Sequence, residues 1–553
     1  MGAVTADESA KNDSSSCNKC RCCTWLIITI VVIVVAIVAL MVLKSSNPKT
    51  DYKAAVVEYS PIIFDLPRKT ILENVDQYET IISNASHYGV DIIVFPEAGL
   101  TGVHIPAERH LAKDYLVEIP SPESNTRPCS DPSCDKVLRK ISCAAKTNKI
   151  YVAINLLEIY YCTADDPDCP DDGAYFFNTN IVFDREGTLI ARYRKYNLFV
   201  EKAFNSTKEP ELCTFKTDFG VTFGMFICFD ILFRDPSVRL VQEKQVTDVV
   251  YSAAWFSEMP LLTAVSVQAA WAYSMDVNLL AAGYNNPSMT GGGSGIYAGT
   301  KGPLVVIMPQ NAGTKLLIAT VPKKNVDSLP LDYFIELEEE LFEKNSHKRN
   351  SLILSDDKTV SVFNDMKFLQ DLSLQSFDIQ PLAESAGATQ IHTNHLSYEN
   401  ESFCCNLEVT WQSEAKFSDF SSYKMVAYSG NRNFSLASVN HIEACGLILC
   451  AENSISSCGI MPDLNLKNTD VKILSIKISA KSFNVASIPV PSTLTSSLYP
   501  LDVADFTFNS SIVKENDKEY YSIEMHLVKP VTNLITFAVY KLPSDPSNAH
   551  KTR

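Results

Sequence analysis

Between residues 51 and 322 the chain alternates repeatedly between short apolar runs and amphipathic segments. Apolar runs bounded by turn residues predict buried strands, and apolar residues spaced three to four apart predict helices. Alternation of the two predicts an α/β domain. The expected strands are 54–59, 92–95, 150–157, 180–184, 189–194, 221–228, 248–253, 278–282, 303–308 and 316–321, and the expected helices are 69–87, 135–147, 236–242 and 262–273.

The chain after residue 322 has a different pattern. Residues 323–357 are charge-rich and include ELEEELFEK at 336–344, which is typical of a solvated linker helix. From 358 to 553, short alternating segments separated by Pro and Ser predict a second, mostly β domain. With 553 residues, two folded domains are also what the length predicts. The clearest of these short segments are 406–410, 424–428, 473–478 and 534–540.

The N-terminal region contains a run of 20 uncharged, mostly apolar residues, 24–43 (TWLIITIVVIVVAIVALMVL). This length can cross a bilayer as one helix. A cleaved signal peptide is the alternative, although its apolar region usually has about 7–15 residues. We expect an uncleaved signal-anchor preceded by a disordered polar tail, 1–23.

Glycosylation sequons indicate the orientation of this span, because the flanking Lys and Arg residues are balanced. One N-x-[S/T] match, Asn12, precedes the span. Five follow it, at Asn84, Asn205, Asn400, Asn433 and Asn509. Together with the many cysteines, they predict that the bulk of the chain is lumenal or extracellular and that the N-terminus is cytosolic. A secreted chain is the alternative.

The 16 cysteines fall into two groups. Four precede the span in CNKCRCC, where S-acylation is favoured over a closed zinc site: Cys17, Cys20, Cys22 and Cys23. Of the twelve that follow, two pairs lie in Pro/Asp-rich loops and predict local disulfides, Cys129 with Cys134 and Cys162 with Cys169. Cys143, in a helical pattern, is expected to be a buried free thiol, and Cys213 has no assignment.

Three strands each end at an ionisable residue: Glu97 after 92–95, Lys195 after 189–194, and Cys228 within VTFGMFICFDILFRD. Open α/β folds place ligands at such strand ends. Glu97 could take the proton of the thiol, and Lys195 could lower the thiol's pKa and hold an oxyanion. No histidine lies between His110 and His347, so the usual Cys–His pairing has no local candidate. Taken alone, Cys228 could equally be a structural cysteine.

These three segments, FPEAG, YRKYNLF and FICFDILFRDP, resemble the Glu–Lys–Cys triad of the nitrilase superfamily and in particular its biotinidase–vanin branch. SAAW at 252–255 and GSGIY at 293–297 extend the resemblance, which covers the chain from about residue 52 to the C-terminus. It implies a four-layer α-β-β-α sandwich at 52–322, followed by a vanin-type β-rich domain at 358–553. Disulfides are then expected among Cys404, Cys405, Cys445, Cys450 and Cys458.

The resemblance also implies roles for residues around the triad. The backbone N–H of Phe229 would help hold the oxyanion, and Glu201 would be the family's second glutamate, although it could be a solvent-facing loop acid. Trp255 would line the substrate pocket, with core packing as the alternative. Asn285 and Asn286 match substrate-side positions. Gln268 replaces a histidine common in vanins, and MTGGGSG at 289–295 differs from the usual MTGSG.

The expected function is hydrolysis of a non-peptide linear amide through a Cys228 thioester, with pantetheine as the leading substrate and biotin amides as the second. A catalytically idle surface-binding protein and a cytosolic small-amide amidase are the rival functions. No metal or organic cofactor is expected, since the thiol, acid and ammonium suffice. The net charge of -16 argues against nucleic acid as a partner. The oligomeric state is not predicted.

Overall fold

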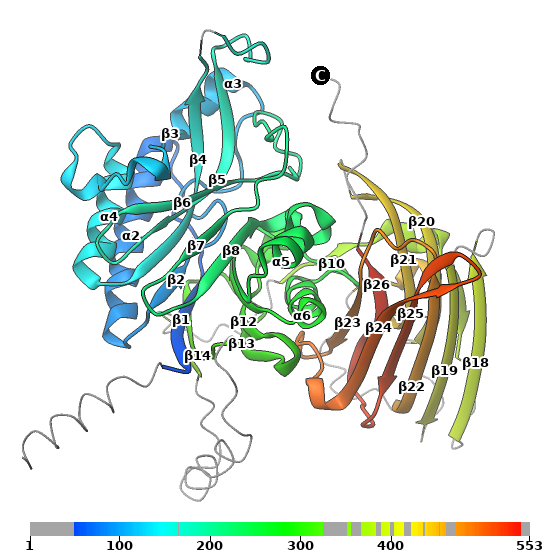
Figure 1. Ribbon diagram of the computed structural model, residues 1–553. Helices are drawn as coiled ribbons and strands as arrows, with labels where there is room; N and C mark the ends of the chain where they lie inside the picture. The colour runs from blue at the N-terminus through cyan, green and yellow to red at the C-terminus, as the bar shows by residue number, and fades with distance from the viewer. Residues whose placement is uncertain are drawn as a thin grey trace, which may run out of the picture. The chain divides into compact units, whose positions relative to one another are not determined.

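The structure is a computed structural model, and it describes residues 49–163, 165–324, 351–355, 366–382, 389–398, 403–413, 422–434, 437–452, 454–460 and 471–542 (Figure 1). The chain divides into two units, 1–50 and 51–553, and the elements below all belong to the second. In the described ranges, no helix combines the length and apolar character needed to cross a bilayer. The expected tail at 1–23, the expected span at 24–43 and most of the expected linker lie outside these ranges.

Residues 51–355, which contain Glu97, Lys195 and Cys228 and are called the catalytic half below, carry the predicted alternation of strands and helices. Its strands are β1 (Asp51–Glu58), β2 (Ile92–Val94), β3 (Val117–Glu118), β4 (Tyr151–Tyr161), β5 (Ala174–Phe183), β6 (Leu189–Arg194), β7 (Thr214–Lys216), β8 (Thr222–Ile227), β9 (Asp248–Ala253), β10 (Glu258–Met259), β11 (Asn278–Gly283), β12 (Ser294–Ala298), β13 (Pro303–Ile307), β14 (Lys315–Pro322) and β15 (Ser351–Ser355). Its α-helices are α2 (Pro67–His87), α3 (Arg109–Ala112), α4 (Lys136–Asn148), α5 (Arg239–Lys244) and α6 (Ala264–Met275). β15 shows that 351–355, expected in the linker, extends a sheet instead.

The first sheet has the order β15-β14-β1-β2-β4-β5-β6, with β3 paired to β4. Successive residues of a strand point to opposite faces, and in β1 both faces are apolar. Ala54 and Val56 belong to the core shared with the second sheet. Ala55 and Val57 pack in the core that contains α2 and α4. A sheet covered on both sides reads as a continuous apolar run, which explains why its strands were predictable.

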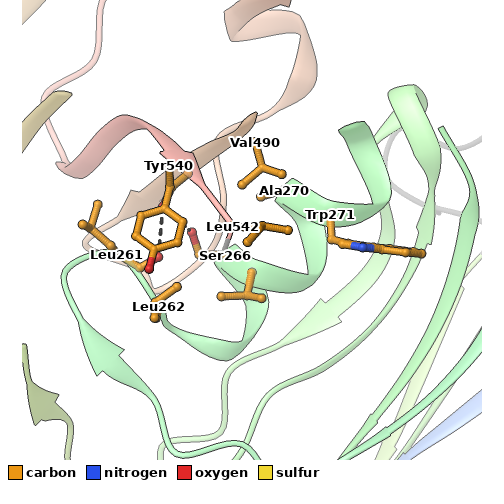
Figure 2. A pocket seen from close by; sticks show the side chains of 10 residues that line it. Leu261, Leu262, Ser266, Ala270, Trp271, Val490, Tyr540 and Leu542 are labelled. Carbon is orange, nitrogen blue, oxygen red and sulfur yellow. Dashed lines mark hydrogen bonds between the residues drawn. The ribbon is translucent and has the colours of Figure 1, made fainter. Parts of the chain in front are cut away.

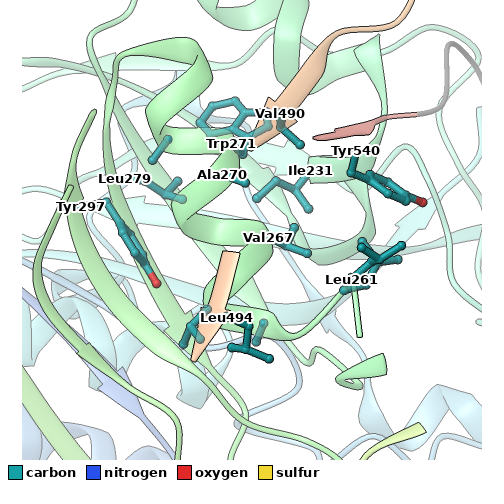
Figure 3. Packing of buried hydrophobic residues seen from close by; sticks show 14 of the residues in the cluster. Ile231, Leu261, Val267, Ala270, Trp271, Leu279, Tyr297, Val490, Leu494 and Tyr540 are labelled. Atoms are coloured by element: carbon teal, nitrogen blue, oxygen red, sulfur yellow. The ribbon is translucent and has the colours of Figure 1, made fainter. Parts of the chain in front are cut away.

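The second sheet has the order β13-β12-β11-β9-β8-β7, and its central strands β8, β9 and β11 are parallel. It faces the first sheet across a common core and carries α6 on its other side, which completes the expected four-layer sandwich. Helix α6 is apolar around most of its circumference, as expected for a helix that is buried on all sides. Figure 3 shows Val267, Ala270 and Trp271 of α6 packed with Val490 and Leu494 of the C-terminal half.

The C-terminal half consists of two five-stranded antiparallel sheets, β17-β20-β21-β26-β23 and β18-β19-β22-β25-β24. Buried and exposed residues alternate along β22, so the second of these sheets buries one face, whereas β23 and β26 of the first sheet are buried along their whole length. The short strand β10 of the catalytic half pairs in parallel with β16 and connects the halves. The strands are β16 (Leu369–Gln370), β17 (Asp378–Pro381), β18 (Thr389–Tyr398), β19 (Phe403–Ser413), β20 (Ser422–Phe434), β21 (Ala437–Cys450), β22 (Val471–Ser482), β23 (Pro489–Thr495), β24 (Phe506–Glu515), β25 (Lys518–Leu527) and β26 (Leu534–Lys541).

The disulfides confirm part of the expected pairing and correct the rest. Cys162 bonds Cys169 as predicted, but Cys129 bonds Cys143 and not Cys134, so Cys143 is not a free thiol and Cys134 is. The reason is local: Ser142 of α4 accepts a hydrogen bond from the backbone N–H of Cys129, which brings this loop onto the helix next to Cys143. In the C-terminal half Cys405, rather than Cys404, bonds Cys445, and Cys450 bonds Cys458.

Candidate active site

Cys228 lies where β8 ends and a 3-10 turn, Cys228–Leu232, begins. Its φ of 46° is unusual for a residue with a side chain, and such strained positions occur often at active sites. Two interactions hold the turn: the Tyr251 hydroxyl donates to the Cys228 carbonyl at 2.9 Å, and the Asp230 carboxylate accepts the backbone N–H of Ile227 at 3.1 Å. The thiol is therefore presented by a turn that its surroundings fix.

Asp230 holds this turn against β6 and the segment that follows it. Its carboxylate accepts hydrogen bonds from the Tyr193 hydroxyl at 2.7 Å and from the backbone N–H of Asn197 at 2.8 Å. Burial raises the pKa of Asp230 to about 6. No role was predicted for Asp230 from the sequence, so this structural role was missed.

Glu97 and Lys195 meet directly, as the strand-end argument predicted. The Lys195 ammonium donates to Oε1 of Glu97 at 2.7 Å, and the backbone N–H of Ala254 donates to Oε2 at 2.8 Å. The Cys228 thiol lies close enough to Glu97 and Lys195 for both charges to act on its pKa. All three side chains are 5% exposed or less. The structure thus brings together the three residues predicted from separate strand ends.

Glu201 completes this cluster. Its Oε2 accepts the Lys195 ammonium at 3.0 Å and the backbone N–H of Phe199 at 2.8 Å. Its Oε1 accepts the side-chain amide of Asn178 at 2.5 Å. Glu201 is therefore part of the buried ionic network, and the alternative of a solvent-facing loop acid does not describe it.

Burial opposes every charge at this site and is the largest influence on all three groups. The charge and hydrogen bond of Lys195 outweigh burial at Glu97, whose pKa lies below its usual value. The two carboxylates hold the pKa of Lys195 well above its usual value. Burial and the Glu97 charge raise the pKa of the Cys228 thiol well above normal, because Lys195 offsets them only in part. The resting site holds a carboxylate, an ammonium and a neutral thiol.

The remaining predicted residues surround this network. The Phe229 ring packs against Phe199, at 5.1 Å between centroids, one residue after Cys228. Trp255 follows Ala254 and is 7% exposed, with its indole N–H donated to the Leu262 carbonyl at 2.9 Å. Trp255 therefore lies beside the site with its polar atom already bonded.

Gln268 and Asn285 are each 1% exposed and make their hydrogen bonds within the protein. Gln268 donates to the Gly293 carbonyl at 3.0 Å and accepts the Tyr297 hydroxyl. Asn285 donates to Glu58 at 3.0 Å. Both side chains thus support the glycine-rich segment 291–293 and its surroundings rather than pointing into open space.

Asn178 is the residue of the site that the sequence prediction missed. It lies on β5 and is 3% exposed, and its side-chain amide donates to Oε1 of Glu97 at 2.7 Å as well as to Glu201. A signal for it was present, because β5 reads AYFFNTNIVF and places two asparagines on one face of an otherwise apolar strand.

A cavity of about 10 Å³ lies at a different place, between α6 and the C-terminal half. Figure 2 shows the side chains that line it. Leu261, Ser266, Trp271, Val490 and Tyr540 are among the residues that line it. Its volume suits a single water at most. None of the triad residues contributes to this cavity, so it is a packing gap and not the catalytic pocket.

Comparison with known proteins agrees with this geometry. The carbon–nitrogen hydrolase family matches residues 53–330, and the vanin C-terminal domain matches 366–546. Vanin-like protein 1 of Drosophila melanogaster is 34% identical over 508 residues, which cover 88% of this chain and 85% of the relative. The chain belongs to the vanin–biotinidase branch of the carbon–nitrogen hydrolases.

Relatives of the chain in this branch are named for both expected activities, pantetheinase and biotinidase. Pantetheinase of Mus musculus is 35% identical over 438 residues, 76% of this chain and 78% of the relative. Biotinidase of Takifugu rubripes is 32% identical over 428 residues, 74% of this chain and 81% of the relative. A solved amidase from Nesterenkonia sp. has 17% identity and a TM-score of 0.37 over 52% of this chain and 96% of its own. This vanin-family chain is a hydrolase of carbon–nitrogen bonds other than peptide bonds.

Proposed function

We propose that this protein is a membrane-tethered amidohydrolase that cleaves pantetheine into pantothenate and cysteamine through a thioester on Cys228. The observation that carries this proposal is the buried pair of the Glu97 carboxylate and the Lys195 ammonium, 2.7 Å apart, whose charges act on the Cys228 thiol beside them. A thiol with a raised pKa is a poor nucleophile until a neighbouring base takes its proton. Glu97, which is ionised at rest, is placed to be that base.

The acylation step follows from this charge state. Glu97 takes the thiol proton as sulfur attacks the amide carbonyl, and a C–S bond forms while the carbonyl oxygen becomes an oxyanion. Lys195 and the N–H of Phe229 are the proposed donors to that oxyanion. Glu97 then returns the proton to the nitrogen, the C–N bond breaks, and the amine leaves. The acyl group remains on Cys228 as a thioester.

Deacylation uses the same groups in the opposite sense. Glu97, again a carboxylate, takes a proton from a water molecule that attacks the thioester carbonyl. The C–S bond breaks, the acid leaves, and the proton returns to the sulfur. Glu201 accepts a second hydrogen bond from the Lys195 ammonium, so the ammonium keeps its position through both half-reactions.

The choice of pantetheine rests on the relatives and on two positions near the glycine-rich segment. The identity to mouse pantetheinase, 35%, and to pufferfish biotinidase, 32%, differs little. Gln268, which stands where vanins commonly have a histidine, donates to the Gly293 carbonyl and so changes how this segment is supported, while Asn285 donates to Glu58. We therefore keep biotin amides as the second substrate class, and the experiment below separates the two.

The tether rests on the apolar run 24–43, and the extracellular location on the sequons that follow it. Of these, Asn84 and Asn509 are exposed on the structure and Asn205 is partly exposed, which glycan attachment requires. Expressed full-length protein should remain with membranes in alkaline carbonate and should lose mass on glycosidase treatment. Replacing Asn84 and Asn509 by Gln should reduce that loss, and no loss from the unaltered chain would contradict the location.

The decisive test is single-turnover hydrolysis by the full-length chain, purified in mild detergent, with pantetheine and biotinyl-lysine in parallel. Cys228→Ala is the matched control. We expect release of pantothenate, and no release from the variant. Release of biotin alone would assign the second substrate class. Release of neither acid, with folding verified by circular dichroism, would contradict the proposed hydrolysis of vitamin amides.

A further inference from the structure

We propose that Asn178 is a positioning residue for the general base, and that a chain of asparagine amides starting at the backbone N–H of Ala98 fixes its orientation. The proposal rests on the proposed function, because it assigns Glu97 as the base. Asn178 contacts neither sulfur nor substrate in this arrangement. It acts on the reaction through Glu97 and Glu201.

The Asn178 amide is shared between two carboxylates. Its Nδ2 donates to Oε1 of Glu97 at 2.7 Å and to Oε1 of Glu201 at 2.5 Å, so both of its hydrogens are used. Lys195 bridges the same two carboxylates, at 2.7 Å and 3.0 Å. Two negative charges thus face one positive charge, and the amide supplies the additional donors that stabilise the second carboxylate.

These bonds form only if the amide presents nitrogen, not oxygen, to the carboxylates. An asparagine side chain fits its site in either orientation, and its partners decide between them. Here the partner of Oδ1 is Nδ2 of Asn155, at 2.6 Å. Asn155 is itself 1% exposed and lies on the neighbouring strand β4, opposite Asn180 in the pairing register.

The orientation of Asn155 is set in turn by a group that can only donate. Its Oδ1 accepts the backbone N–H of Ala98 at 2.9 Å, so its Nδ2 must face Asn178. Ala98 directly follows Glu97 and has a φ of 56°. The chain of hydrogen bonds therefore begins one residue from the base and returns to its carboxylate, which couples the backbone at the end of β2 to the side chain it carries.

The consequence for catalysis is a lower pKa of Glu97. Donors to an ionised carboxylate favour the ionised form. Removing them should raise the pKa of Glu97 and shift the acidic limb of any reaction that needs the carboxylate toward higher pH. A purely structural residue would change rates or stability without moving this limb.

β5 provides a matched control. Asn180 lies two residues from Asn178, on the same face, and is fully buried. Its Nδ2 donates to the Ser252 hydroxyl at 3.2 Å and its Oδ1 accepts Nδ2 of Asn155 at 3.1 Å, so neither bond involves a carboxylate. Asn178→Leu and Asn180→Leu therefore remove the same functional group from the same strand, and only the first removes donors to Glu97.

The test measures the pH dependence of Cys228 alkylation by iodoacetamide in the full-length chain, followed by mass spectrometry of the Cys228 peptide. This readout excludes the thiols of Cys134 and Cys213. In Asn178→Leu we expect the acidic midpoint of the alkylation rate to rise by about one pH unit. At a pH below both midpoints, the variant should then be alkylated about tenfold more slowly than the unaltered chain, and at high pH the two rates should become equal. Asn180→Leu should keep the midpoint of the unaltered chain.

A second variant, Asn155→Leu, keeps Asn178 but removes the donor that orients it, and should shift the midpoint in the same direction. If Asn178→Leu does not fold, Asn155→Leu tests the proposal in its place. Coincident profiles for Asn178→Leu and the unaltered chain, or an equal shift in Asn180→Leu, would overturn the proposal. A shift in a chain that hydrolyses neither pantetheine nor biotinyl-lysine would leave the amide chain standing and reject the proposed function instead.

Discussion

The most informative perturbation for stability is the replacement of Arg432, a buried cation between the two halves of the protein. Arg432 lies on β20 and is 1% exposed. Its Nη2 lies 2.9 Å from Oε1 of Glu258 and 2.9 Å from Oδ2 of Asp371, and Nη1 contacts the Tyr540 hydroxyl. The side chains of the two acids are 15% and 2% exposed. Arg432→Met would keep the apolar stem but leave two buried carboxylates facing each other.

The magnitude follows from that geometry. Removing one partner from a buried ion cluster typically costs about 3–5 kcal/mol, because the remaining charge loses both solvent and counterion. We expect Arg432→Met to lower the free energy of unfolding by this amount at pH 7.5. The triple variant Arg432→Met/Glu258→Gln/Asp371→Asn removes the uncompensated charges and should recover most of the loss.

The loss should also depend on pH, with a predictable sign. Burial raises the pKa of Glu258, the charge of Asp371 adds to the increase, and Arg432 opposes both. Without Arg432, the folded-state pKa of Glu258 rises further above its unfolded value. A group of this kind contributes stability that is complete at a pH below the unfolded pKa and is lost as pH rises through the folded pKa. The variant should therefore be less destabilised at pH 5 than at pH 7.5.

Urea unfolding of the full-length chain at both pH values, followed by tryptophan fluorescence, measures these differences. The buried Trp271 and Trp411 report on the catalytic and C-terminal halves respectively. A loss below about 1 kcal/mol, an equal loss at both pH values, or a triple variant as unstable as the single one would each refute the reasoning from buried charge.

Three further predictions test other parts of the structure. Glu97→Gln should lower kcat for the amide substrate by about 10²–10⁴-fold, because it removes the base. The double variant Cys228→Ala/Glu97→Gln should have the same kcat as Cys228→Ala alone, and additive losses in steady-state kinetics would argue against a step that the two residues share. Val200→Gly should raise the melting temperature, because Val200 is exposed with a φ of 62° and glycine removes about 1–3 kcal/mol of backbone strain at a cost of about 0.4–1 kcal/mol in unfolded-state entropy. Val528→Gly changes an exposed valine without a positive φ and should lower the melting temperature. A lower melting temperature in both variants would contradict the proposed strain at Val200. Burial raises the pKa of Glu58 from 4.5 to about 7. The protonated Glu58 therefore contributes to the free energy of unfolding in full below about pH 4.5, and this contribution of about 3 kcal/mol, at ~1.36 kcal/mol per pKa unit, is lost as pH rises through 7. Glu58→Gln should lack this loss in urea unfolding at pH 5 and pH 8, and equal pH slopes for the two chains would exclude Glu58 as its source.

The triad and most of the longer strands of the catalytic half were predictable because they are encoded locally, whereas β3, β7, β10, β12 and β15 were not expected. Strands buried on two faces read as apolar runs, and an ionisable residue directly after such a run marks the sheet edge where ligands bind. The alternation of the C-terminal half was also visible, but only in part. Only the interior of β20 (Ser422–Phe434) was expected, and no segment was expected within β21 (Ala437–Cys450). Buried polar residues such as Ser429 and Glu443 interrupt the apolar pattern of these two strands.

The partners within the site were not predictable from local pattern, because they depend on strand register. Asn178 reaches Glu97 only since β4 and β5 pair so that Asn155 lies beside it. The same reason explains the wrong cysteine pairing: spacing favoured Cys134 for Cys129, whereas packing of the loop on α4 selects Cys143. A polar residue inside an apolar strand signals a buried partner, but its identity requires the pairing of the sheet.

The two halves of the protein depend on each other through the segment that follows β9. Ala254 donates its N–H to Glu97, and four residues later Glu258 is paired with Arg432 of the C-terminal half. The Thr536 hydroxyl donates to the Pro260 carbonyl at 2.8 Å, and Ser266 of α6 donates to the Thr493 carbonyl at 2.9 Å. Since α6 is apolar on the face that meets β23, removal of the C-terminal half would expose that face and release the segment that orients Glu97. The C-terminal half therefore covers an apolar face of the catalytic half and holds the segment that carries a hydrogen-bond donor to Glu97.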